Sequence, residues 1–345
     1  MERGLLTYSG IIAKVHALEG HLLVQEDYEK IASLESTSDF ITFLKSKRGY
    51  QKVFQNYDES TLHRVKIEQL LSIAPILDLE RLYQFATVEQ RPILSLLLVR
   101  YEVRTVKALL ELVYSKEMPS NFYSFDPFFA AHSHIPVEAL AASKTMDEFI
   151  QNLQGTRYYD LFLRLQATGH TTLRDYAVQL DIFYFTYVWK AKDRILKGTN
   201  KKIITELYGV QADLLNLLWI YRSKQFFDMD PTEILTTILP IHYHLKNEEL
   251  KVLIEAVSAE EFMKLAQNTY YGKGHLSLAT LDMETFYKKN SLLVYKRLSS
   301  TYSISMAPVL RFVYEKEQEL DRLTTALECI RYHLEPNEIL KYLTL

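Results

Sequence analysis

The chain has 345 residues with 40 basic and 43 acidic side chains, which gives a net charge of −3 at pH 7. The charge is spread along the chain and no large basic segment occurs, so we expect no nucleic-acid partner. Only 10 Gly and 9 Pro occur, well below average usage, and this predicts few and short loops. The single cysteine, Cys329, excludes an internal disulfide and fits a reducing compartment, and we expect it to be a buried, inert thiol.

The start of the chain lacks the pattern of a signal peptide. Residues 1–3 precede a mixed amphipathic run rather than a continuous apolar segment. The longest apolar run, residues 93–99, is interrupted by Ser95 and is far too short to span a bilayer. We therefore expect any association with a membrane to be made through a protein partner or through the protein surface.

A short pattern occurs three times along the chain: a hydroxyl residue, an acid three residues later, and then Phe. It lies at residues 36–40, 145–149 and 258–262, with spacings of 109 and 113 residues. The pattern predicts a capping box, in which the hydroxyl accepts from the N3 amide and the acid accepts from the cap amide. The Phe then stands at N4 of the helix, where it can turn toward a core. Three copies in order predict a triplicated helical unit.

Further markers follow each copy in the same order. A Leu-Asp pair, expected to open an aromatic-rich helix, occurs at residues 77–78, 180–181 and 281–282. A late acidic residue, expected to start a further helix, follows at Glu102, Asp213 and Glu319. A tyrosine also stands eight to ten residues after each capped Phe, at Tyr50, at Tyr158 or Tyr159, and at Tyr270 or Tyr271.

Apolar residues at helical spacing dominate the long segments and predict the fold class. One stripe consists of Leu94, Leu97, Leu98, Tyr101, Val106, Leu109 and Leu110, and another begins with Leu214, Leu217, Leu218 and Tyr221. The strict alternation typical of strands is almost absent, so the predicted class is all-α. The markers divide the chain into three similar helical units of about 110 residues, 1–115, 116–230 and 231–345. Unequal spacings between the markers predict divergent copies.

The usual signatures of catalytic and metal sites are absent from the sequence. It contains no G-x-x-x-x-G-K-[ST], no G-x-G-x-x-G and no H-E-x-x-H. Gly272 and Gly274 resemble a fragment of a phosphate loop, but a turn is the better interpretation because the required strand and spacing are missing. Two histidine pairs could ligate a metal from extended segments, although no further ligands accompany them: His132 with His134, and His242 with His244. We therefore nominate no catalytic, cofactor-binding or metal-binding residue.

Three other features have competing interpretations. Asp213 and Asn216, three residues apart on one helix that also carries Arg222, predict polar contacts at an interface between units or a plain surface position. The basic residues at 197–202 could attract nucleic acid, but a solvated helix end explains them as well. The 24 Tyr and 17 Phe would suit the cavity of an all-α enzyme of the isoprenoid-cyclase type. That chemistry needs a D-D-x-x-D motif, which is absent, so the aromatic residues are expected to pack between helices.

Three segments, together with the triplication, carry a resemblance to a known family. The segments are the opening run at residues 8–23, residues 213–216 followed by Arg222, and the closing run at residues 336–340. In this order they resemble the C subunit of V-type and archaeal-type rotary ATPases, the relative of the d subunit of eukaryotic V-type ATPases. The resemblance covers essentially the whole chain.

The resemblance implies an all-helical protein whose three units form a pseudo-threefold funnel. It implies a non-catalytic central-stalk (rotor) subunit that acts as a socket between the shaft of the soluble ATPase head and the membrane proteolipid ring, during ATP-driven ion transport or ATP synthesis. The implied partners are the proteolipid ring and the D and F subunits of the central shaft, with the membrane reached only through the ring. The implied location is the cytoplasmic face of the membrane, as a peripheral part of the complex, and no cofactor is implied.

Two other classes of function stay open from the sequence. The first alternative is a free-standing all-helical scaffold or adaptor that has the same fold without a rotor. The second is an enzyme with an all-α cavity, which would need a bound cofactor or a pocket with perturbed titratable groups.

Overall fold

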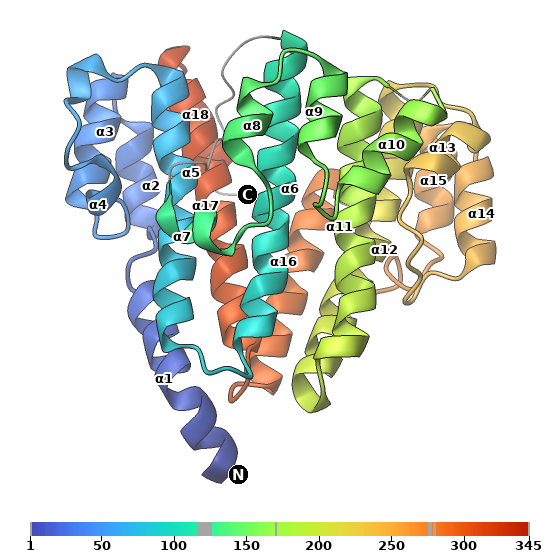
Figure 1. Cartoon of the computed structure of the whole chain (residues 1–345), viewed down its shortest axis with the longest axis horizontal. Helices are drawn as coiled ribbons and strands as arrows, with labels where there is room; N and C mark the ends of the chain where they lie inside the picture. The colour runs from blue at the N-terminus through green and yellow to red at the C-terminus, as the bar shows by residue number, and fades with distance from the viewer. Residues whose placement is uncertain (1, 116–125, 170, 275–277, 279–280, 344–345) are drawn as a thin grey trace. The chain divides into compact units, whose positions relative to one another are not determined.

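The computed structural model describes residues 2–115, 126–169, 171–274, 278 and 281–343. Every regular element in these ranges is a helix (Figure 1), so the predicted all-α class is confirmed. The chain divides into two compact units. Unit 1 comprises Met1–Leu173 and Pro308–Leu345, and unit 2 comprises Arg174–Ala307. The division into 1–115, 116–230 and 231–345 stays a prediction.

Unit 1 contains the helices of both ends of the chain. They are α1 (Glu2–Glu19), α2 (Gln25–Ala32), α3 (Thr37–Ser46), α4 (Gln51–Phe54), the short 3-10 helix η1 (Glu59–Thr61), α5 (Arg64–Phe85), α6 (Arg91–Ser115), α7 (Pro127–His132), α8 (Val137–Ala142), α9 (Met146–Asn152), α10 (Tyr159–Ala167), α17 (Ala307–Arg331) and α18 (Pro336–Leu343). Unit 2 contains α11 (Leu173–Ile195), α12 (Gly198–Phe226), α13 (Pro231–Thr237), α14 (Asn247–Glu255), α15 (Ala259–Ala266) and α16 (Met283–Thr301).

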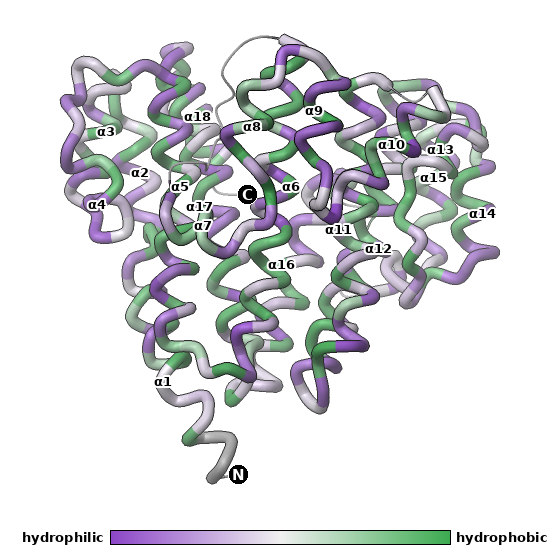
Figure 2. The backbone as a smooth tube through the Cα atoms, in the orientation of Figure 1, coloured by the Kyte–Doolittle hydropathy of each residue, from purple (hydrophilic) through white to green (hydrophobic). Residues whose placement is uncertain are grey.

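The apolar stripes of α6 and α12 form the cores as predicted. All seven predicted stripe residues of α6 are buried, and so are Leu214, Leu217 and Leu218 of α12. Along both helices, hydrophobic and hydrophilic residues recur at helical spacing (Figure 2). In unit 2, α12 packs against α15 and α16, where it buries Phe262 and Phe286.

One core of unit 1 joins the two ends of the chain. Residues of α2, α3 and α5, including Phe40, pack in the same apolar cluster as Leu323 and Leu327 of α17. The final helix, α18, contributes Ile339 and Leu343 to this cluster and contacts α2 directly. The N-terminal helices therefore depend on the C-terminal helices for the burial of their apolar faces.

The hydroxyl part of the three capping patterns is confirmed. Each hydroxyl accepts from the amide of the third helical residue: Ser36 from Asp39 at 3.1 Å, Thr145 from Glu148 at 3.2 Å, and Ser258 from Glu261 at 3.2 Å. The Phe at N4 of α3, α9 and α15 is fully buried in each case, at Phe40, Phe149 and Phe262.

The predicted return bond from the acid to the cap amide is wrong in all three copies. Glu148 Oε2 accepts from the amide of Lys144, and Glu261 Oε2 accepts from the amide of Val257, each at 2.7 Å. Both amides belong to the residue before the cap. Asp39 Oδ2 accepts from the hydroxyl of its own cap residue at 2.6 Å. In two other helices a Glu at N3 does accept from the cap amide, Glu233 from Asp230 at 3.0 Å and Glu249 from Lys246 at 2.9 Å, so the local backbone geometry decides which amide the acid reaches.

The Thr145→Ala change is expected to lower the free energy of unfolding of unit 1 by about 1 kcal/mol, because the amide of Glu148 loses its acceptor. Urea denaturation followed by far-UV circular dichroism measures the change. Thr42→Ala, at an exposed position of α3, is the matched control and should stay within about 0.5 kcal/mol. Equal effects of the two changes would show that the cap contributes nothing measurable.

Two further boundary predictions are wrong. The Leu-Asp pairs at 77–78 and 180–181 lie inside α5 and α11, and only Asp282 stands at a helix start, where it caps α16. The late acids do not start helices either, because each lies in the middle of α6, α12 or α17. An acid at a helix start and a buried acid inside a helix look the same in one sequence, and burial decides between them.

Candidate functional sites: three buried carboxylate clusters

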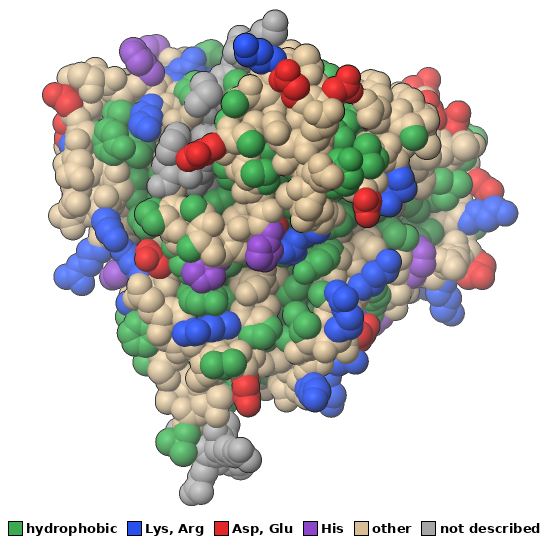
Figure 3. Space-filling view, viewed as in Figure 1, with side chains coloured by type: hydrophobic (Ala, Val, Ile, Leu, Met, Phe, Trp, Pro, Cys, Tyr) green, Lys and Arg blue, Asp and Glu red, His purple; other side chains and the backbone are tan. Residues whose placement is uncertain are grey.

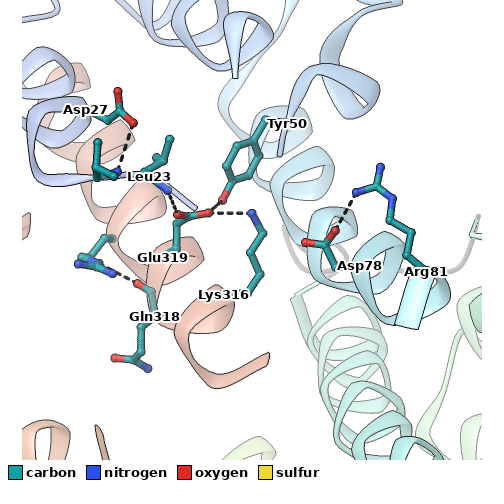
Figure 4. Close-up of polar contacts among 10 residues, drawn as sticks. Leu23, Asp27, Tyr50, Asp78, Arg81, Lys316, Gln318 and Glu319 are labelled. Atoms are coloured by element: carbon teal, nitrogen blue, oxygen red, sulfur yellow. Dashed lines mark hydrogen bonds and ion pairs between the residues drawn. The ribbon is translucent and has the colours of Figure 1, made fainter. Parts of the chain in front are cut away.

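The carboxylate of Glu319 on α17 binds the segment before α2 and the residue before α4. Glu319 Oε2 accepts from the amide of Leu23 at 2.5 Å, and Oε1 accepts from the hydroxyl of Tyr50 at 2.6 Å. Lys316 Nζ, one turn earlier on α17, donates to Glu319 Oε1 at 2.7 Å (Figure 4). Lys316 and Glu319 are both almost completely buried, at 2% and 1% exposed.

The surroundings of Glu319 fix the direction of these hydrogen bonds. Burial, and then the charge of Glu319, raise the pKa of Tyr50 well above its ordinary value, so the phenol keeps its proton and donates it. The ammonium of Lys316 also lies over the Tyr50 ring, 3.9 Å from its centroid. Nearby, Asp78 on α5 pairs with Arg81 at 2.8 Å, and burial raises the pKa of Asp78 (Figure 4).

Glu102 on α6 makes the same kinds of contact in another part of unit 1. Its Oε1 accepts from the amide of His134 at 2.8 Å, and its Oε2 accepts from the hydroxyl of Tyr158 at 2.7 Å. Arg157 is the nearby cation, with its Nε 3.7 Å from Glu102 Oε2. His134 precedes α8 and Tyr158 precedes α10, so this carboxylate connects two loops to α6.

Asp213 on α12 makes the corresponding contacts in unit 2. Its carboxylate accepts from the amides of Tyr243, His244 and Leu245, at 3.1, 2.6 and 3.2 Å, and from the hydroxyl of Tyr271 at 2.8 Å. Four donors therefore satisfy the side chain, which is completely buried. No ion pair to Asp213 occurs within the described ranges, and burial outweighs the hydrogen bonds and raises its pKa.

This raised pKa predicts a pH dependence of the stability of unit 2. The native state holds the Asp213 proton more tightly than the unfolded state. The stabilisation of the folded state that results is therefore complete below the unfolded pKa of about 4. It is lost as the pH rises through the higher native value. The advantage of the wild type over Asp213→Asn in free energy of unfolding should therefore shrink as the pH rises above about 4. Urea titrations at several pH values, followed by tryptophan fluorescence, measure it, and an advantage that grew with pH would contradict the assignment.

The three clusters share one plan. A carboxylate in the middle of a long helix accepts from a backbone amide two or three residues before a short helix, and from a tyrosine nine or ten residues after a capped Phe. The tyrosines are Tyr50, Tyr158 and Tyr271, which settles the two ambiguous predictions. Within each predicted unit the tyrosine precedes the acid, but the contacts join different copies. Glu102 binds Tyr158, 56 residues later, Asp213 binds Tyr271, 58 residues later, and Glu319 binds Tyr50 near the opposite end of the chain.

Asp213 and Asn216 both make polar contacts, and a surface position is wrong for both. That these contacts lie at an interface between the predicted units stays a prediction. Asn216 is fully buried and binds Leu239 twice, with its amide donating to the Leu239 carbonyl at 3.0 Å and its oxygen accepting from the Leu239 amide at 2.7 Å. These contacts join residues on either side of position 230, the predicted boundary. Arg222 differs, since it lies half exposed at the surface and pairs with Glu284 at 2.5 Å.

Of the paired histidines, His132, His134 and His244 take part in packing or backbone contacts. The ring of His132 lies against Tyr83 and Phe128, and the ring of His244 stacks on Tyr270 at 3.9 Å between centroids. Burial lowers the pKa of His244. Within the described ranges, no group of three His, Cys, Asp or Glu residues is placed to hold a metal ion.

Gly272 and Cys329, the other residues that the sequence singles out, have structural positions. Gly272 lies in a turn after α15, where a Cβ would approach the carbonyl oxygen of Ala266 to 2.3 Å, so the turn interpretation is confirmed. Cys329 is buried in the core of unit 1, and burial raises the pKa of its thiol. Among the helices of the described part of the chain, none combines the length and the apolar character that a membrane span needs.

Comparisons of the sequence with known proteins point to one family. The sequence profile of the family described as ATP synthase (C/AC39) subunit matches residues 11–342. A protein of Methanosarcina mazei, named as the C subunit of an A-type ATP synthase, is 23% identical over 335 residues, which cover 93% of this chain and 88% of that protein. A protein of the same name from Pyrococcus horikoshii is 24% identical over 344 residues, covering 96% of this chain and 89% of that protein. Because the family match spans nearly the whole chain, this protein belongs to the ATP synthase (C/AC39) subunit family.

Proposed function

We propose that this chain is a non-catalytic central-stalk (rotor) subunit of an A/V-type ATP synthase. In this role it is the socket that couples the shaft of the soluble ATPase head to the membrane proteolipid ring. The family match over residues 11–342 and the names of the relatives support membership of such a complex. The observation that carries the mechanical role is the threefold occurrence of the buried carboxylate cluster.

A part that transmits torque has to resist internal bending. In each cluster, one carboxylate holds a loop amide and a tyrosine hydroxyl against the middle of a long helix, and it does so in a buried place where the bonds are stronger than in water. Breaking such a contact leaves buried polar groups without partners, which costs about 1–3 kcal/mol for each group. The short helices are therefore expected to move together with α6, α12 and α17.

A groove of about 620 Å³ in unit 1 is our candidate surface for the shaft. It lies between α5, α6 and α17, where Ala108 and Leu320 contribute apolar surface. The other eight of its ten lining residues are polar or charged, with more acids than bases: Glu68, Glu111, Asp321, Glu328, Arg104, Lys107, Thr324 and Thr325. Such a lining favours a polar partner with a basic surface, and the D and F subunits are the proposed partners. The proteolipid ring is the proposed partner on the membrane side, which would place the chain at the cytoplasmic face as a peripheral subunit.

Affinity purification of the tagged chain from membranes in mild detergent tests the assignment. Recovery of proteolipid, shaft subunits and ATPase activity is the expected result. A chain recovered alone would favour the free-standing scaffold or adaptor and would contradict the socket.

A second purification tests the groove. Thr325→Arg places a long cation among the lining residues and should reduce the recovery of shaft subunits relative to proteolipid. Thr42→Arg, on the exposed side of α3, is the matched control and should leave the ratio unchanged. Equal recovery with both variants would remove the groove as the shaft surface while leaving the socket itself in place.

A further inference from the structure

One end of unit 2 concentrates positive charge in a chain that is otherwise acidic. Residues 190–202, which span the turn between α11 and α12, contain six Lys or Arg and one Asp, although the whole chain carries a net charge of −3. Lys and Arg side chains gather near this turn in the space-filling view (Figure 3). We call the exposed basic and aliphatic side chains of this region the basic end: Lys190, Arg194, Ile195, Lys197, Lys202 and, from the neighbouring turn, Ile304.

The single acid of this segment is already neutralised. Asp193 pairs with Lys192 at 3.0 Å and with Lys201 at 2.9 Å. Lys192 is itself buried, with its ammonium over the Trp189 ring at 4.1 Å from the centroid. The four cations of the basic end have no carboxylate partner within the described ranges.

Helix stability does not account for the lysines on the α12 side. The N-terminus of a helix carries a partial positive charge and favours acidic residues, which contribute about 0.3–1 kcal/mol each. The first turn of α12 has no acid, and Lys197 stands at its N-cap. Lys202 follows at the start of the second turn, next to Lys201, which is already paired with Asp193. The local field therefore attracts anions more strongly than the lysines alone would.

Exposed aliphatic side chains accompany the cations. Ile195 is 45% exposed at the end of α11, and Ile304 is 41% exposed in the turn before α17. The two turns are neighbours within unit 2, because the amide of Met306 donates to Asn200 Oδ1 at 3.4 Å. The basic end thus combines two aliphatic side chains with surrounding cations.

We propose that the basic end binds the anionic headgroups of a lipid bilayer directly. Lys or Arg near an anionic membrane surface contributes about 1 kcal/mol each, and aliphatic side chains add favourable burial at the interface. Lys190 and Lys202 stand five residues or fewer from the turn, roughly 8 Å along a helix, which is within about one Debye length at physiological salt. The family resemblance implies that the chain reaches the membrane only through the ring. The proposed contact with lipid would be an additional attachment.

Flotation of the full-length chain with protein-free vesicles tests this proposal. Vesicles of phosphatidylcholine alone are compared with vesicles that contain phosphatidylserine as a third of the lipid. We expect binding only to the anionic vesicles, and binding that weakens as salt is raised. The combined variant Lys190→Gln, Arg194→Gln, Lys197→Gln and Lys202→Gln should lose at least roughly tenfold in vesicle affinity.

A matched variant controls for net charge. Lys251→Gln, Lys264→Gln, Lys273→Gln and Lys289→Gln remove four exposed lysines elsewhere in unit 2 and should retain wild-type binding. The tryptophan fluorescence of both variants checks that unit 2 is folded. Equal binding by the two variants, or no binding of the wild type to anionic vesicles, would overturn the proposal. If the wild type ignored vesicles but the basic-end variant failed to co-purify with proteolipid, the partner would be an acidic protein surface instead. Because the vesicles contain no ATP synthase subunits, the outcome is independent of the socket.

Discussion

Glu319→Ala is expected to lower the free energy of unfolding of unit 1 by roughly 3–5 kcal/mol, the usual cost of removing one partner of a buried ion pair. The change leaves the buried ammonium of Lys316 without a carboxylate and removes the acceptor of the Tyr50 hydroxyl and of the Leu23 amide. The N-terminal helices lose their polar attachment to this part of α17. They should consequently show faster amide hydrogen exchange over residues 20–54.

Two probes separate this effect from a general loss of structure. Both tryptophans, Trp189 and Trp219, lie in unit 2, so their fluorescence during urea denaturation reports on that unit, whereas far-UV circular dichroism reports on the whole chain. We expect the change to appear in circular dichroism with little change in fluorescence. Asp321→Asn, at an exposed position two residues along α17, is the control and should change stability by about 0.5 kcal/mol or less. Similar effects of Glu319→Ala and Asp321→Asn would show that the cluster does not stabilise unit 1.

Asp213→Ala is expected to destabilise unit 2 by roughly 3 kcal/mol or more, because three backbone amides and one hydroxyl lose their common acceptor. The change releases the segment before α14 from this part of α12. The fluorescence transition of the tryptophans should therefore move to lower urea concentration. Hydrogen exchange should rise at residues 243–245.

Comparison with Tyr271→Phe divides the effect between the amides and the hydroxyl. Removal of the hydroxyl alone leaves the three amide bonds of Asp213 intact, and it should cost only about 1–2 kcal/mol. Arg222→Ala, at the half-exposed ion pair further along α12, should cost about 1 kcal/mol or less. If Asp213→Ala cost no more than Arg222→Ala, the loop would not depend on the carboxylate.

The stability of the N-terminal helices depends on residues almost 300 positions away. Glu19 pairs with Arg311 of α17, and Leu23 donates to Glu319, over separations of 292 and 296 residues. The contact between α18 and α2 also joins segments from opposite ends of the chain. Within unit 1, then, the two ends of the chain complete a cluster whose counterparts at Glu102 and Asp213 are each built from one continuous stretch.

The helical class, the buried Phe at N4 and the residue types of the three clusters can all be predicted from the amino-acid sequence. Those features follow from interactions within a few residues, namely the spacing of apolar side chains and the acceptance of a helix amide by a nearby hydroxyl. The sequence shows an acid that recurs in order, at Glu102, Asp213 and Glu319, and a tyrosine that recurs likewise, with Tyr50 as its first copy. It does not show which tyrosine pairs with which acid. A spacing pattern records order along the chain and holds no information on which copy folds onto which.

The pairing of Tyr50 with Glu319, the burial of Asp213 and Asn216, and the position of each late acid in the middle of its helix emerge only in the folded chain. An acid inside a helix can face solvent or lie in a core. In a core its carboxylate needs hydrogen-bond donors, and here segments distant in the sequence supply them once the chain has folded around it. The Glu side chains of the caps depend on tertiary structure in a similar way. Glu148 accepts from the amide of the residue before the cap rather than from the cap amide itself. The backbone conformation at the start of the helix decides between these two amides, and that conformation is set by the folded chain rather than by the residue types.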